Sequence, residues 1–184
     1  MKTFTKRGFQ KQTTNLFFPS VRYLEHGTSV TNLIRIVKQG GELRPRSDTG
    51  AKGSGVDCNT KVVYLSVVPM NESFDSLYGP RRGHVTFYLD PAVLVDFFPW
   101  IHINPDWTAY GHCTSHSFSI DRLQQQIRMS RDTSVIEILV QHRIPLIPYL
   151  RYILVHPDNI ATIVPQLQGT PFAQHLRVLG TIDR

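Results

Sequence analysis

Short runs of β-branched and aromatic residues constrain the fold of this 184-residue chain more than any other feature of its sequence. They read SVRYLEHG (20–27), KVVYLSVV (61–68), HVTFYLDP (84–91), SVIEILVQ (134–141) and LRYILVHP (150–157). Such composition, bounded by Gly, Pro or polar residues, is typical of β-strands. We therefore expect a strand at each of these places.

Helical spacing occurs between and after these runs. In residues 29–41 the apolar side chains recur at intervals of three, one and three, with Thr28 or Ser29 as the N-cap and Gly40 and Gly41 as the end. We also expect helices at 72–79 and 120–129, a short helix or turn at 92–98, and a helix or strand at 160–167. Because helices and strands do not alternate regularly, the predicted fold class is α+β.

Polar or irregular segments make up the rest of the chain. Residues 1–20 show no clear period and predict an N-terminal arm, and residues 47–59 form a Gly-rich loop. The aromatic segment 99–119 reads as an irregular loop that covers a surface or carries function. Since this length suits one core, we expect residues 21–184 to form a single domain.

Composition narrows the class of protein. Hydrophobic residues make up 41% and charged residues 18% of the chain, as in folded soluble proteins. No apolar run approaches the roughly 20 residues of a membrane-spanning helix, and the basic N-terminus lacks the features of a secretory signal. Cys58 and Cys113 form no disulfide framework, so we expect a cytoplasmic protein. The net charge of +6 favours polyanionic partners without identifying one.

Candidate functional residues lie on three separate predicted strands. His26 and Gly27 end the first strand, Tyr64 lies in the second, and Glu137 interrupts the apolar run VIEILV. The first three also have ordinary structural interpretations: a hydrogen-bonded histidine, a turn glycine with positive φ, and a core tyrosine. Glu137 fits a structural role least well, because a buried carboxylate is costly unless something pairs with it. The wall of a cleft is the simplest position for it.

In this order the residues resemble the His-Tyr-Glu signature of the ADP-ribosyltransferases of the diphtheria-toxin and poly-ADP-ribose-polymerase branch. HGTSVTNLIRIVKQGGEL (26–43) is similar to the first block of that family, VVYLSVVPMNESFDSLYG (62–79) to the second, and SVIEILVQHRIPLIPYLRYILV (134–155) to the third. The segment HCTSHSFSI (112–120), ahead of a Gln-rich helix, is also similar to the DarT-type toxins that modify DNA.

The resemblance implies a fold and an activity. The fold would be two small packed sheets, antiparallel or mixed, with flanking helices around an NAD cleft. The activity would be NAD-dependent mono-ADP-ribosyl transfer, with NAD as co-substrate. The bond between nicotinamide and ribose breaks through an oxocarbenium-like sugar, so the site must hold the leaving ring and stabilise positive charge.

The same resemblance implies roles for individual residues. Glu137 would hold the 2′-hydroxyl of the nicotinamide ribose, stabilise the cation and orient the nucleophile. Gly27 would bind nicotinamide through its backbone, and His26 would bind the adenosine ribose. Tyr64 and Tyr78 would sandwich the nicotinamide ring, a contact that suits aromatic faces.

Further contacts to NAD are expected from residues around these. By resemblance, Thr28 and Ser66 would add secondary hydrogen bonds. Arg44 and Arg46 would meet the pyrophosphate, since guanidinium matches phosphate geometry, although solvated loop charges are an equal alternative. The spacer 43–59 is more polar than the family pattern, so contacts at the adenine end stay unassigned.

The fold does not define the acceptor. The net charge, the turn at Arg81 and Arg82 and the aromatic segment around Trp107 favour a nucleic acid, whose bases stack on rings and whose phosphates meet cations. Trp107 also has an ordinary interpretation in loop packing. We expect an intracellular toxin or phage-defence effector that modifies DNA or RNA and is restrained by an antitoxin. A transferase acting on protein side chains and a non-catalytic NAD- or nucleic-acid-binding module are the alternatives.

Two further motifs lead to no predicted site. His112, Cys113 and His116, with His102, are close enough in sequence to share a metal, but structural zinc sites more often show two paired clusters. GAKGSG (50–55) lacks the GK[ST] ending and the following helix of a phosphate-binding loop. We expect neither a metal nor a membrane partner.

Overall fold

All five strands expected from the sequence are present in the computed structural model, which describes residues 21–45, 48, 62–70, 82–104, 116–129 and 136–179. They are β1 (Val21–Ser29), β3 (Val63–Pro69), β4 (His84–Leu89), β7 (Glu137–Val140) and β9 (Leu150–Val155). β-branched and aromatic residues at these places pack well on a pleated surface, which explains the agreement.

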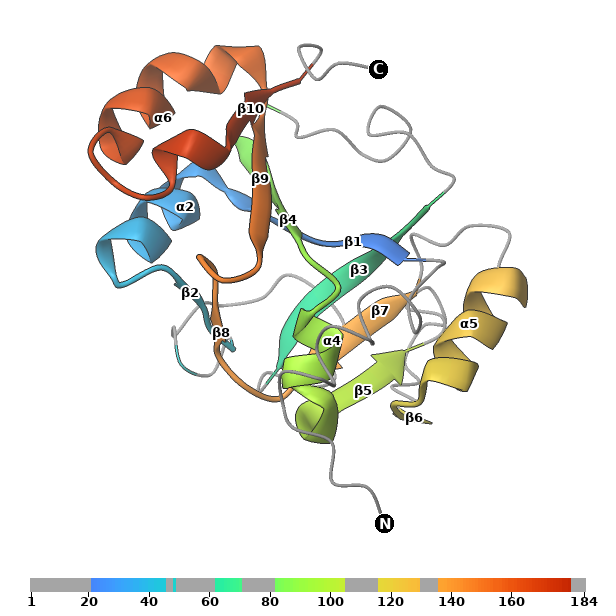
Figure 1. Ribbon diagram of the computed structural model, residues 1–184. Helices are drawn as coiled ribbons and strands as arrows, with labels where there is room; N and C mark the ends of the chain where they lie inside the picture. Colours follow the sequence, from blue (N-terminus) through green and yellow to red (C-terminus); the bar gives the residue numbers. More distant parts are fainter. Residues whose placement is uncertain are drawn as a thin grey trace.

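One eight-stranded sheet organises the protein (Figure 1). Its order is β10-β9-β4-β1-β3-β7-β5-β6, with β5 at Ile101–Asn104, β6 at His116–Ser117 and β10 at Leu176–Val178. Neighbouring strands are antiparallel except β9 and β10, which are parallel. A small second sheet pairs β2 (Glu42–Leu43) with β8 (Ile144–Pro145). The predicted α+β class is confirmed, although the two sheets are very unequal in size.

The helices flank the sheet. α2 (Val30–Lys38) and α6 (Ile160–Leu167) lie side by side near β4 and β9, whereas α4 (Val93–Asp96) and α5 (Ile120–Met129) lie toward β5 and β7 (Figure 1). Short 3-10 turns occupy Phe98–Trp100, Pro157–Asn159 and Ala173–His175. The helices predicted at 29–41 and 120–129 are therefore present, and the segment 160–167 is a helix rather than a strand. Within the described ranges, no helix is long and apolar enough to cross a membrane.

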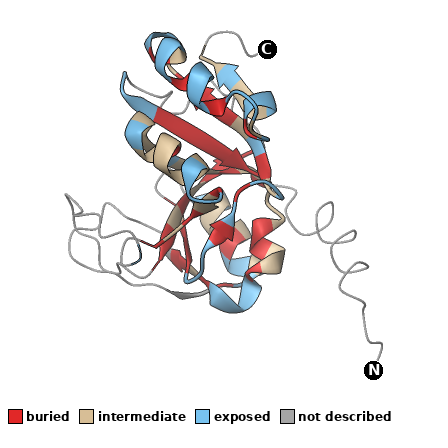
Figure 2. Ribbon diagram, turned by 90° about the vertical axis from the view of Figure 1, so that its left-hand side faces the viewer, coloured by how far each residue is buried: buried red, intermediate tan, exposed pale blue. Residues whose placement is uncertain are grey.

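Buried side chains lie on both faces of the central strands. Leu24, Leu65, Phe87 and Ile138 belong to the main cluster, which the helices cover. Tyr88 belongs to a smaller cluster on the other face, with Val68 and Leu154. Figure 2 shows the resulting buried strands and the partly exposed outer faces of the helices. A central strand buried on both faces reads as a continuous apolar run, as HVTFYL does.

One predicted loop is wrong in part. The segment 99–119 was expected to be irregular, yet it contains β5 and β6. In β5 the buried Ile101 and Ile103 alternate with polar residues, and Ile103 pairs with Ile138 of β7. Pairing with a distant strand therefore decides the conformation of this short run. The predicted N-terminal arm and the helix at 72–79 lie outside the described residues, and the single-domain boundary stays a prediction.

Candidate active site

The site begins where strands β1 and β3 separate. Their register, as described, ends where Glu25 lies opposite Ser66. β1 nevertheless stays paired with β4 as far as Ser29, and β3 stays paired with β7. A split therefore opens inside the large sheet, bordered by residues 26–29 of β1 and by residues 63–65 of β3.

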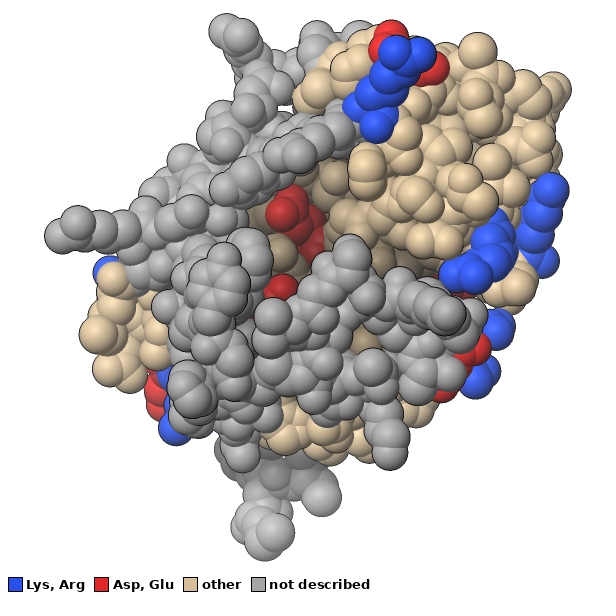
Figure 3. Space-filling model, turned by 180° about the vertical axis from the view of Figure 1, so that it is seen from behind, with Lys and Arg blue, Asp and Glu red and all other residues tan. Residues whose placement is uncertain are grey.

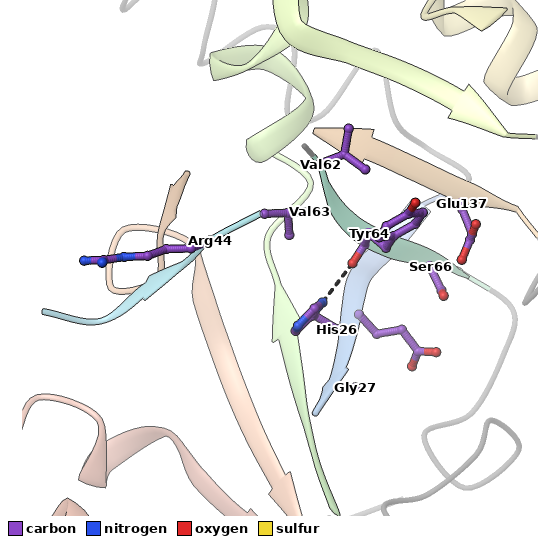
Figure 4. A pocket seen from close by; sticks show the side chains of 9 residues that line it. His26, Gly27, Arg44, Val62, Val63, Tyr64, Ser66 and Glu137 are labelled. Atoms are coloured by element: carbon purple, nitrogen blue, oxygen red, sulfur yellow. Dashed lines mark hydrogen bonds between the residues drawn. The ribbon is translucent and has the colours of Figure 1, made fainter. Parts of the chain in front are cut away.

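The His26 side chain bridges this split. Val67 donates its N–H to Ile136 on the β7 side at 3.2 Å, so alternation along β3 directs the Tyr64 carbonyl toward β1. There the Nδ1 atom of His26 donates to that carbonyl at 2.9 Å (Figure 4). Because a carbonyl only accepts, Nδ1 carries the proton, and Nε2 of the neutral ring is an acceptor for a hydroxyl. The ring also stacks on Phe87, with centroids 6.5 Å apart.

Gly27 directs backbone groups into the same split. Val30 donates its N–H to Gly83 on the β4 side at 3.0 Å, so alternation turns the N–H and C=O of Gly27 toward β3. Its φ is not positive, because the residue lies within β1 opposite Thr86, and the turn interpretation is therefore wrong. A Cβ built on Gly27 would meet no atom of the described residues within 4 Å. Neither conformation nor packing requires glycine here, but its absence of a side chain keeps these backbone groups accessible.

A pocket of about 280 Å³ fills the split. Its lining comes from β1, from β3 and the residue before it, from the start of β7 and from the segment after β2: Glu25, His26, Gly27, Arg44, Val62, Val63, Tyr64, Ser66 and Glu137. On the face seen in Figure 3, acidic side chains are recessed in a hollow, and the Lys and Arg side chains in view lie outside it. The recess is thus suited to a ligand with positive or hydrogen-bond-donating groups.

Strand register aligns the polar side chains of this pocket. Glu25 lies opposite Ser66, and Ser66 lies opposite Glu137, so the three side chains share one face of the sheet. Glu137 is the first residue of β7 and half-buried, which agrees with the predicted position on a cleft wall. Figure 4 shows Ser66 and Glu137 next to the Tyr64 ring.

Sequence reasoning missed Glu25. The residue is half-buried, and the Tyr88 hydroxyl from β4 donates a hydrogen bond to its carboxylate. Burial is the main cause that raises the pKa of Tyr88 above its ordinary value, and the negative charge of Glu25 adds to it. The signal used for Glu137, a carboxylate inside an otherwise apolar run, is absent here, because β1 (VRYLEHGTS) carries other polar residues around Glu25.

The structure brings only some of the predicted NAD-binding residues together. His26, Gly27, Tyr64, Ser66, Glu137 and Arg44 line the pocket. The guanidinium of Arg44 points away from Tyr64 and Glu137, and it donates to Glu42 and to the Gln39 carbonyl, each at 3.2 Å (Figure 4). Its predicted pyrophosphate contact stays a prediction.

Other predicted residues lie away from the pocket lining or cannot be placed. The Thr28 hydroxyl accepts from Asn32 Nδ2 at 3.2 Å beside α2, and Arg82 is exposed and 3.9 Å from Asp158. Tyr78, Arg81 and Trp107 lie outside the described residues, as do Arg46, His112 and Cys113. Within the part that is described, no group of three or more His, Cys, Asp or Glu residues could hold a metal ion.

Comparison with solved structures shows that this architecture is the fold of DarT. Three structures of DarT from Thermus sp. 2.9 carry this finding. The complex with carba-NAD+ has a TM-score of 0.60 and 16% sequence identity over 88% of this chain and 96% of that chain. The complex with NAD+ has a TM-score of 0.58 and 14% identity over 88% and 94% of the two chains.

The third structure is the complex of the same DarT with ADP-ribosylated single-stranded DNA. Its TM-score is 0.56, with 13% identity over 85% of this chain and 92% of that chain. No protein-family profile matches the sequence, and no curated protein matches it significantly. The fold predicted from the sequence motifs is thereby confirmed by the structural comparison. The sequence identity of 13–16% is too low for a comparison of sequences alone to show it.

Proposed function

We propose that this protein is an NAD-dependent mono-ADP-ribosyltransferase that modifies DNA. The observation that carries the proposal is the convergence of His26, Gly27, Tyr64, Ser66 and Glu137 on one pocket at the split of the large sheet. These residues come from three strands that are distant in sequence, and each offers a group suited to one part of NAD. The fold shared with DarT complexes of NAD+ and carba-NAD+ supports the same substrate.

The chemistry of these residues fits nicotinamide release. NAD supplies an activated ribose, whose bond to the cationic nicotinamide breaks as positive charge develops on the sugar. Glu137 would hold the 2′-hydroxyl and offset that charge, and the backbone of Gly27 would hold the carboxamide of nicotinamide. His26, with its proton on Nδ1, would accept a hydrogen bond from a ribose hydroxyl at Nε2. Tyr64 would restrain the leaving ring by stacking.

DNA is the acceptor that the available features favour. The chain carries a net charge of +6, which suits a polyanion, and the fold is shared with a DarT bound to ADP-ribosylated single-stranded DNA. We propose that Arg81, Arg82 and Trp107 contribute to DNA binding. Modification of DNA would make the protein an intracellular toxin or defence effector, and an antitoxin that blocks or reverses it would be its natural partner.

A transfer assay tests the proposal. Wild-type protein is incubated with NAD labelled in its adenylate phosphate and with a mixed-sequence pool of single-stranded DNA oligonucleotides. We expect label on DNA and release of nicotinamide, and a loss of at least about 1,000-fold in Glu137→Gln, as for removal of a main electrostatic group. Asp121→Asn, the same change of carboxylate to amide on the exposed side of α5, should keep full activity.

Other outcomes lead to different conclusions. Label on lysate protein and none on DNA or RNA would replace the DNA acceptor by a protein side chain. Binding of NAD without nicotinamide release, equal in wild type and Glu137→Gln, would make the protein a binding module. Label on RNA alone would support the transferase activity and replace DNA by RNA as the acceptor.

A further inference from the structure

Glu25 lies in the pocket without a role in the proposed nicotinamide release. It lines the cavity with Glu137, and register places Ser66 between the two carboxylates on one face of the sheet. Adjacent strands lie about 4.8 Å apart, so the Cα atoms of the two glutamates are separated by roughly 10 Å. Backbones at this separation leave space between the two side chains for a nucleophile. Inverting glycosidases, which also cleave at an anomeric carbon, likewise use two carboxylates that leave room for a nucleophile between them.

A tyrosine of the neighbouring strand β4 holds the Glu25 carboxylate. Tyr88 on β4 lies opposite Glu25, is 1% exposed, and donates a hydrogen bond from its hydroxyl to the carboxylate. The raised pKa of Tyr88, caused first by burial, keeps it protonated and therefore a donor at neutral pH. Tyr23 packs edge-on against Tyr88 with centroids 5.9 Å apart and limits its movement. A carboxylate held in a fixed position by such a hydrogen bond is pre-organised to interact with a ligand group in the pocket.

The other ionisable groups of the described lining are accounted for. Glu137 is assigned to the sugar, and His26 holds the Tyr64 carbonyl through Nδ1. Arg44 cannot accept a proton, because its guanidinium only donates hydrogen bonds. It is also paired with Glu42. Among the described residues, the titratable and charged groups around Glu25 include Arg22, Tyr23 and His26 on its own strand, Tyr88 on β4, Tyr64 on β3, Glu137 on β7 and Arg44 after β2.

We infer that Glu25 is a second catalytic carboxylate, the general base that accepts the proton of the acceptor atom during transfer. This inference rests on the proposed function. The bond between ribose C1′ and nicotinamide breaks, and its electron pair leaves with neutral nicotinamide. A lone pair on the acceptor nitrogen or oxygen forms the new bond to C1′, and the proton from that atom passes to Glu25 and then to solvent. Glu137 stabilises the sugar while Glu25 takes the proton.

The experiment compares Glu25→Ala with wild type in two assays. One measures NAD affinity by isothermal titration calorimetry, and the other measures transfer of labelled ADP-ribose to the mixed-sequence DNA pool. We expect NAD affinity to change by less than about threefold and transfer to fall about 100-fold or more, the usual contribution of a general base. Sodium formate should restore transfer in Glu25→Ala, because a small carboxylate can replace the missing one. Asp121→Asn should change neither quantity nor respond to formate.

A second variant tests the role of Glu25 without removing it. Tyr88→Phe deletes the hydrogen bond, and a carboxylate that has lost a donor is protonated more readily. We expect the loss of transfer at acidic pH to begin at a higher pH in Tyr88→Phe than in wild type. Melting temperatures of both variants are measured to separate folding from catalysis.

The outcomes separate the two proposals. An inactive wild type overturns the proposed function and this inference together. An active wild type, inactive Glu137→Gln and fully active Glu25→Ala overturn only the role of Glu25. A loss in Glu25→Ala that formate does not restore, with an unchanged acidic limb in Tyr88→Phe, also overturns it and leaves the transferase standing.

Discussion

His26 and Gly27 show how single residues define this site. The sequence predicted both positions, because a histidine-glycine pair at the end of a strand is visible without knowledge of the fold. It could not predict that the Tyr64 carbonyl fixes the His26 tautomer, since that acceptor is 38 residues away. The predicted positions of Tyr64, Ser66 and Glu137 agree with the pocket, whereas their contacts to NAD stay predictions.

Gly27 and Gly41 make a matched pair for a test at this scale. In Gly27→Ala the new methyl group enters open space in the pocket, so we expect stability to be unchanged or slightly higher and NAD affinity to fall about tenfold. In Gly41→Ala the Cβ would lie 2.5 Å from Phe172 Cζ at a φ of +73°, so we expect a loss of about 2 kcal/mol in unfolding free energy. Urea unfolding and calorimetry with NAD measure both.

The pair also defines the result that would contradict this interpretation. If Gly27→Ala binds NAD as tightly as wild type, the backbone of Gly27 is not a nicotinamide contact. If Gly27→Ala is as unstable as Gly41→Ala, glycine is needed at residue 27 for folding rather than for a ligand.

At the scale of elements, the junction of β1 and α2 was the most predictable part of the structure. Ser29, one of the two residues that the sequence offered as N-cap, is the cap, and its hydroxyl accepts from the Asn32 N–H at 3.1 Å. Gly40 and Gly41, with φ of 98° and 73°, follow the end of the helix. Caps and helix ends are local, so a local pattern is enough to locate them. β5 was missed because its pairing with β7 is not local.

Removal of the cap should weaken this junction. We expect Ser29→Ala to lower the unfolding free energy by about 1 kcal/mol, since one helix N–H loses its acceptor. Ser29→Asp keeps an acceptor at the N-cap and should stay within about 0.5 kcal/mol of wild type. Chemical denaturation measures both variants, and an equal loss in the two would show that Ser29 acts through something other than capping.

At the scale of the whole molecule, net charge bears on association with DNA, and sheet topology bears on the assembly of the pocket. The net charge of +6 would favour association with the proposed DNA acceptor, whereas the pocket carboxylates Glu25 and Glu137 would serve the proposed reaction. The sheet order places β1, β3 and β7 next to one another, and this brings residues 26, 64 and 137 to one place.

Salt dependence tests the DNA-binding role of Arg82. The Arg82 side chain is 86% exposed, and its Nε lies 3.9 Å from Asp158 Oδ2, which is long for an ion pair. The pair is therefore weak, and the guanidinium is available to a phosphate. If it contacts one phosphate, Arg82→Ala should reduce the slope of log affinity against log salt by about 0.7 for single-stranded DNA. Arg128→Ala on α5 is the matched control. Fluorescence anisotropy measures the slopes, and identical slopes for wild type and Arg82→Ala would remove Arg82 from the interface.

The sequence by itself determined the α+β class, the five strands, the location of α2 with its cap at Thr28 or Ser29, and the chemical identity of His26, Tyr64 and Glu137. These depend on local composition and on side-chain chemistry, which a chain carries before it folds. Only the tertiary structure decided that β1 and β3 separate beyond Glu25, that β5 is a strand, and that Glu25 faces Ser66 and Glu137. Strand register and strand neighbours arise from pairing between distant segments, and a shift of one residue would turn every side chain to the other face.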